Sequence, residues 1–216
     1  MKIIDIKNWK RRVPYENFIK YSNPVFSLST RLDVTQLYNL CKRRNTSFFT
    51  DFLYIVMKSI NETEEFRLRI CRGEVVLYDK VKPSFIVLTD DGVIAPCRVD
   101  MNDDYRQFYA EARAQTELVK NGGNAYPFSA DGDNDCCYIS CMPWTDLTAI
   151  NNPYNYSDAD STSIPRLAWS KCVDENGRKK MTMDIAAHHA LIDGEPVCRA
   201  FNLIQKYLDD AEEILR

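Results

Sequence analysis

Two adjacent histidines, His188 and His189, are the residues of this chain best suited to acid–base chemistry. They are the only histidines among 216 residues, and Asp193 and Gly194 follow them after a short apolar stretch. An imidazole can take a proton from a hydroxyl group near neutral pH when one ring nitrogen is free and a hydrogen bond holds the other. The pair therefore predicts a general base, a buried structural histidine, or one of each.

The segment that carries the pair, residues 181–189, has the length and alternation of a strand. Because successive side chains of a strand point to opposite faces, His188 and His189 must point in opposite directions. Only one of them can face a given cleft, and the other then needs a structural partner. On the residues alone, the catalytic and the structural interpretation are equally supported.

Other reaction chemistries lack their motifs. The sequence has no Gly-x-Ser-x-Gly nucleophile elbow, no P-loop and no Gly-x-Gly-x-x-Gly fingerprint. Its eight cysteines include no Cys-x-x-Cys pair, and Cys136, Cys137 and Cys141 have no histidine near them in the sequence. We therefore expect no metal site. We expect reduced thiols, since the N-terminus does not resemble a secretory signal.

Composition favours one packed domain over residues 1–216. Hydrophobic residues make up 45% and charged residues 27%, which is typical of a folded globule. The formal net charge of −3 gives no basic surface for nucleic acid or an anionic membrane. Charges interrupt the first residues, and no apolar run approaches the length that spans a bilayer. We therefore expect a cytoplasmic protein with neither nucleic acid nor membrane as a partner.

Extended and helical patterns alternate along the chain. Alternating or continuous apolar patterns predict strands over residues 2–6, 25–32, 66–71, 74–78, 84–88, 93–97, 136–142, 166–173 and 180–189. Apolar residues at helical spacing predict helices over 47–60, 103–120 and 196–215, a helical turn over 15–21, and a helix capped by Asp33. Polar stretches at 121–135 and 151–163 read as loops, and Arg72-Gly73 reads as a hairpin turn.

The pattern His-His-Ala-x-x-Asp-Gly, on a strand followed by a terminal amphipathic helix, resembles the signature of the chloramphenicol acetyltransferase family of coenzyme A-dependent acyltransferases. Further matches follow along nearly the whole chain in the expected order and spacing. They are Asn8-Trp9-Lys10-Arg11-Arg12, Phe26-Ser27-Leu28, Phe66-Arg67-Leu68, Gln107-Phe108, Pro143-Trp144 and Pro165.

This resemblance implies an α/β fold, a two-layer sandwich of a mixed β-sheet and packed helices. It makes His189 the general base that deprotonates an acceptor hydroxyl for direct attack on the thioester of acetyl-CoA, and it makes His188 structural. Asp193 and Arg11 correspond to an ion pair that shapes the site. The family is trimeric with sites between subunits, so a homotrimer that uses acetyl-CoA as co-substrate and no metal is implied.

Two positions depart from the family on the side of the transition state. Ala149 stands where the family carries the serine that stabilises the oxyanion, and Ala168 stands at a second hydroxyl position, a threonine. Loss of one oxyanion donor typically costs about 10²–10³ in turnover. Thr148, one residue earlier, is the possible oxyanion support, although on a strand it would face the opposite way.

Substrate positions differ as well. Phe18 takes the place of a substrate-contacting tyrosine in the family, and we assign it to the substrate pocket. Lys171 matches a lysine near the coenzyme, whereas Cys172 replaces a tyrosine that stacks on adenine.

The expected function is an acetyl-CoA-dependent O-acetyltransferase whose acceptor is a small hydroxyl compound such as chloramphenicol, and whose activity would confer resistance to that antibiotic. One alternative is an acyltransferase for a different hydroxyl acceptor. The other is a non-catalytic relative that binds coenzyme A or a small molecule.

Overall fold

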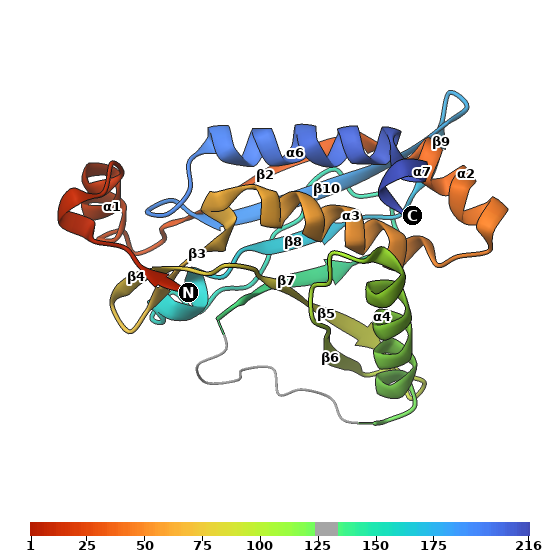
Figure 1. Cartoon of the computed structure of the whole chain (residues 1–216), viewed down its shortest axis with the longest axis horizontal. Coiled ribbons are helices and arrows are strands. Elements are labelled where there is room, and N and C mark those ends of the chain that lie inside the picture. The colour runs from red at the N-terminus through yellow and green to blue at the C-terminus, as the bar shows by residue number, and fades with distance from the viewer. Residues whose placement is uncertain (124–133) are drawn as a thin grey trace.

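One large mixed β-sheet forms the frame of the molecule (Figure 1). The computed structural model describes residues 1–123 and 134–216. The strand order is β2-β10-β8-β7-β5-β6, with β9 paired to β10. β7 runs parallel to both β5 and β8, and the other neighbouring pairs are antiparallel. The strands are β2 Val25–Asp33, β5 Lys82–Leu88, β6 Ile94–Arg98, β7 Cys136–Cys141, β8 Arg166–Trp169, β9 Val173–Glu175 and β10 Arg178–His188.

A second, smaller sheet has the order β1-β4-β3. Its strands are β1 Lys2–Ile3, β3 Leu68–Cys71 and β4 Glu74–Leu77. The turn between β3 and β4 is the predicted hairpin. Arg72 and Gly73 both have positive φ, 53° and 83°, which is the left-handed geometry that a two-residue hairpin turn requires.

Helices cover one face of the large sheet. Figure 1 shows α3 and α6 side by side over the strands, and α4 packs against β5 and β6. This two-layer arrangement confirms the predicted α/β fold. No helix in the described ranges is long and apolar enough to cross a membrane. The α-helices are α1 Arg12–Phe18, α2 Thr35–Arg44, α3 Phe48–Glu62, α4 Tyr105–Lys120, α5 Ala159–Thr162, α6 Gly194–Asp209 and α7 Ala211–Ile214, and two 3-10 helices span Ile6–Asn8 and Glu64–Arg67.

The central strand β10 divides its residues between the two faces of the sheet. Met183, Ile185 and Ala187 belong to the hydrophobic core beneath the helices. The intervening Asp184 and His188 are also buried, but their side chains lie on the opposite face. This face of the sheet therefore carries the buried polar side chains of Asp184 and His188, which are described with the candidate active site.

Several predicted boundaries were wrong. The final helix is two helices, because α6 ends at Asp209 and α7 begins at Ala211. The predicted loop 151–163 contains α5. Asp33 is the last residue of β2 rather than the cap of α2, although its carboxylate accepts hydrogen bonds from both the backbone N–H and the hydroxyl of Thr35. Most of the predicted loop 121–135 lies outside the described residues.

None of the eight cysteines, all of which lie in the described ranges, forms a disulfide bond, and Cys198 is exposed. Among the residues that the structure describes, no group of three His, Cys, Asp or Glu side chains could hold a metal ion.

Candidate active site

His188 is the last residue of β10 and is 1% exposed. Its Nδ1 accepts a hydrogen bond from the backbone N–H of Ala190, at 3.2 Å. Burial, with a smaller contribution from the charge of His189, lowers the pKa of His188 to about 4. The imidazole is therefore neutral at physiological pH, and its contacts belong to the fold.

His189 follows the strand and is held at both ends of its backbone. Its N–H donates to the carbonyl of Pro24 at 2.8 Å, and its carbonyl accepts from Nη2 of Arg11 at 2.6 Å. Its ring is stacked on Phe18, with centroids 3.9 Å apart and planes 6° apart, and lies at a tilt to Phe26 at 4.7 Å. The chain therefore fixes both the backbone and the ring plane of this histidine.

The two ring nitrogens of His189 have different environments. Nδ1 is shut off from solvent and forms no hydrogen bond with any described group. It lies 3.4 Å from Oδ1 of Asp193, and about a third of the side chain (33%) remains exposed. A carboxylate near Nδ1 favours a proton on that nitrogen. A proton on Nδ1 would leave the lone pair of Nε2 available to accept another.

Arg11 joins the two ends of the motif. Its Nη1 and Nη2 donate to both carboxylate oxygens of Asp193, and its Nε donates to the carbonyl of Ala190 at 3.0 Å. The arginine side chain is 13% exposed. The hydrogen bonds from Arg11 lower the pKa of Asp193, which stays ionised. Asp193 precedes α6, yet its carboxylate contacts Arg11 and caps no helix N–H.

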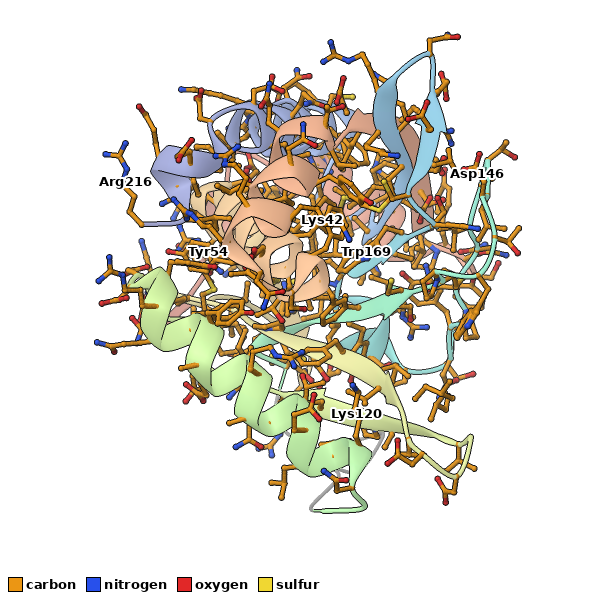
Figure 2. The ribbon with its side chains drawn as sticks, turned by 90° about the vertical axis from the view of Figure 1, so that its right-hand side faces the viewer. Lys42, Tyr54, Lys120, Asp146, Trp169 and Arg216 are labelled. Carbon is orange, nitrogen blue, oxygen red and sulfur yellow. The ribbon has the colours of Figure 1, made fainter. Side chains whose placement is uncertain are left out.

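The larger cavity, of about 480 Å³, lies between α3, α4 and the sheet. Lys171 lines it together with two further basic residues, Arg113 and Lys120. Figure 2 shows Lys120 near the end of α4 and Trp169 in the interior. The cavity suits an elongated ligand with an apolar arm and an anionic end. Its aromatic and apolar lining includes Phe48, Phe49, Phe85, Trp144, Trp169 and Met181.

A second cavity, of about 340 Å³, contains Thr148. Its other lining residues are Ser29, Thr30, Arg31, Asp146 and Thr182. Thr148 lies on an exposed loop beyond the end of β7 at Cys141, so the alternation of a strand, which would turn it away from the position of Ala149, does not apply. His189 lines neither cavity. Within one chain, therefore, the structure brings Arg11, Phe18 and Asp193 to His189, but neither Thr148 nor Lys171.

Sequence reasoning missed Asp184, which is completely buried and lies directly across from Ala168 on β8. Its Oδ1 accepts a hydrogen bond from the Ser29 hydroxyl at 2.7 Å, and Oδ2 has no partner among the described residues. Burial raises the pKa of this carboxyl. The sequence feature that could have identified Asp184 is its position as a single acidic residue within the predicted strand 180–189.

The chain is similar to known proteins along almost its whole length. A family model described as chloramphenicol acetyltransferase matches residues 1–205. The chain is 26% identical over 213 residues to a chloramphenicol acetyltransferase of Proteus mirabilis, covering 96% of this chain and 94% of that protein. It is 27% identical over 205 residues to chloramphenicol acetyltransferase 3 of Escherichia coli, covering 94% of each.

Solved structures agree on the fold. A chloramphenicol acetyltransferase superposes with a TM-score of 0.87 at 28% identity, covering 96% of this chain and 99% of that chain. A dihydrolipoamide acetyltransferase of Azotobacter vinelandii shares the fold at 18% identity, with a TM-score of 0.67 and coverage of 94% and 88%.

The fold and these relatives define an acyltransferase. More specifically, the chain belongs to the chloramphenicol acetyltransferase family and is a coenzyme A-dependent acetyltransferase. The family expected from the histidine motif is confirmed.

Proposed function

We propose that this protein transfers an acetyl group from acetyl-CoA to a hydroxyl group of a small acceptor such as chloramphenicol, with His189 as the general base. One observation carries the proposal. The His189 imidazole is held at its backbone by Pro24 and Arg11 and at its ring by Phe18, while part of the ring stays open to solvent. A positioned imidazole that the acceptor can reach is what general-base catalysis at a hydroxyl requires.

In the proposed reaction, the acceptor O–H donates its proton to Nε2 of His189 while the oxygen attacks the acetyl carbonyl. The tetrahedral intermediate then collapses, the C–S bond breaks, and the imidazolium returns the proton to the thiolate of coenzyme A. Arg11 and Asp193 hold the segment that carries the base. Because Arg11 keeps Asp193 ionised, the proton is carried by His189 and not by Asp193.

The larger cavity supports acetyl-CoA as the acyl donor. Its apolar lining suits the pantetheine arm, and Lys171, Arg113 and Lys120 offer positive charge to the phosphates. Cys172 lines the same cavity without an aromatic ring. We infer weaker stacking on the adenine than a tyrosine would give at this position.

We further propose a homotrimer of subunits in which residues 1–216 form a single domain, with its active sites between subunits. The separation of His189 from both Thr148 and Lys171 within one chain supports this arrangement. The hydroxyl of Thr148 is proposed as the oxyanion donor, because Ala149 stands where the family carries its serine. Acetylation of chloramphenicol by such an enzyme in the cytoplasm would confer resistance.

The test is release of free thiol from acetyl-CoA by the purified protein with chloramphenicol, followed by a panel of other small hydroxyl compounds. Chloramphenicol-dependent thiol release, with acetylated product detected by mass spectrometry, would support the proposal in full. Turnover of another acceptor alone would assign a different substrate. Calorimetric binding of acetyl-CoA without thiol release under any acceptor would contradict catalysis and favour a binding protein.

A further inference from the structure

Arg31, on β2, connects three segments that are far apart in sequence. Its guanidinium donates to both carboxylate oxygens of Asp146, at 2.7 and 3.1 Å. It also donates twice to Oε2 of Glu175 on β9, at 2.9 and 3.1 Å, and once to the hydroxyl of Thr182 on β10, at 3.2 Å. Figure 2 shows Asp146 at the surface, on the side of the molecule that carries the β9–β10 hairpin.

These contacts use all five N–H donors of the guanidinium. A saturated arginine has no donor left for a ligand, although Arg31 lines the second cavity. Single exposed ion pairs contribute little to stability, but a bidentate arginine–carboxylate fork fixes relative geometry. The network therefore holds β2, β9, β10 and the segment that contains Asp146 together.

The segment that it holds is the loop that follows β7. The beginning of this loop is anchored by the backbone, since the N–H of Met142 donates to the carbonyl of Trp169 and the N–H of Lys171 donates to the carbonyl of Thr145. From 146 to 154, none of the described backbone hydrogen bonds involves the loop. The pair between Arg31 and Asp146 is thus the polar anchor at the start of this stretch.

Thr148 lies two residues beyond Asp146 and lines the same cavity as Arg31. We propose that Arg31 is a positioning residue for acetyl transfer, which acts by holding Asp146 and thereby orienting the Thr148 hydroxyl toward the oxyanion. This inference rests on the proposed function. The bidentate pair of Arg31 and Asp146 is called the latch below. Neither residue touches the reacting atoms.

The kinetic test compares Arg31→Gln, Asp146→Asn, Thr148→Val and the double variant Arg31→Gln/Thr148→Val, with acetyl-CoA and chloramphenicol as substrates. We expect Thr148→Val to lower kcat about 100-fold, as for loss of an oxyanion donor, and each latch variant to lower it about 10-fold. KM for acetyl-CoA should stay within about twofold in every variant, since the larger cavity is untouched.

Coupling separates positioning from a general structural effect. If Arg31 acts through Thr148, the double variant is no slower than Thr148→Val alone. Losses that multiply would overturn the proposal, as would an unchanged kcat in either Arg31→Gln or Thr148→Val. Arg43→Gln is the matched control, because Arg43 forms an exposed ion pair with Glu212 rather than with Asp146 or Glu175, and it should retain the wild-type kcat.

A second measurement does not depend on activity. Chymotrypsin should cut residues 147–156 faster in Arg31→Gln than in the wild type or in Arg43→Gln, with fragment masses assigning the site and thermal melting confirming the fold. Equal cutting rates would overturn the latch. Faster cutting combined with no turnover of any acceptor by the wild type would instead contradict the proposed function and leave the latch itself supported.

Discussion

The imidazole of His189 lies flat on the ring of Phe18, with centroids 3.9 Å apart and planes 6° apart. Phe18 ends α1 and His189 follows β10, so this contact joins the N-terminal segment to the proposed base. A stacked ring restricts the rotation of the imidazole about its side-chain bonds. The structure therefore gives Phe18 a contact with the proposed base, in addition to the place in the substrate pocket that the sequence predicts for it.

We predict that Phe18→Leu lowers kcat about 10-fold, because the imidazole loses the surface that fixes its plane. Phe18→Tyr keeps an aromatic ring of the same shape and should retain kcat within about twofold. Steady-state kinetics of both variants with acetyl-CoA and chloramphenicol checks the expectation. Equal losses in the two variants would mean that stacking is not the property that matters.

Arg11 is predicted to be needed for both the rate and the pH dependence of stability. Arg11→Met removes the hydrogen bonds to Asp193 and to the carbonyl of His189, and should lower kcat about 100-fold through misplacement of the base. Since Arg11 lowers the folded-state pKa of Asp193, the ionised carboxylate stabilises the wild type above its unfolded-state pKa of about 3.9.

That contribution is lost as the pH falls through the lowered folded-state pKa. The difference in melting temperature between wild type and Arg11→Met should thus be full at pH 7 and shrink below about pH 4. Thermal melts over this range measure it. A difference that is constant with pH would show that the ionised Asp193 is not its source.

His188 should make the fold sensitive to acid. Its pKa is about 4 in the folded protein, against about 6.5 in the unfolded chain, so the neutral form stabilises the fold above about pH 6.5. As the pH falls from about 6.5 to 4, roughly 3 kcal/mol of stability is lost from this group. His188→Asn offers Ala190 an amide oxygen that does not titrate. Urea unfolding should therefore show a shallower acid slope for this variant, and identical slopes would refute the assignment.

The sequence predicted those parts of the fold and the site that depend on local pattern. Alternation along residues 181–189 identified the strand, which ends at His188, and His188 is buried whereas the side chain of His189 is partly exposed. The ion pair of Arg11 with Asp193 joins residues 182 positions apart, and it followed only from the family resemblance. Local spacing carries no information about such a distant contact.

The errors have physical reasons. The helical spacing of apolar residues continues from α6 into α7, so the spacing predicted one helix and did not reveal the break at Asp210. The loop after β7 is anchored by the salt bridge from Arg31 to Asp146, a contact between residues 115 positions apart that local spacing does not predict. Asp184 was overlooked because its burial depends on the strands on either side, through its register with Ser29 and Ala168.

The central claim is that His189 is the general base of an acetyl transfer. The most direct measurement is kcat for thiol release from acetyl-CoA with its best acceptor, compared between the wild type and His189→Ala. Calorimetry with acetyl-CoA and thermal melting should show that binding and folding are intact in the variant. We predict that kcat falls roughly 10²–10⁴-fold, the range for loss of a positioned general base. Turnover that is unchanged by the substitution would contradict the account.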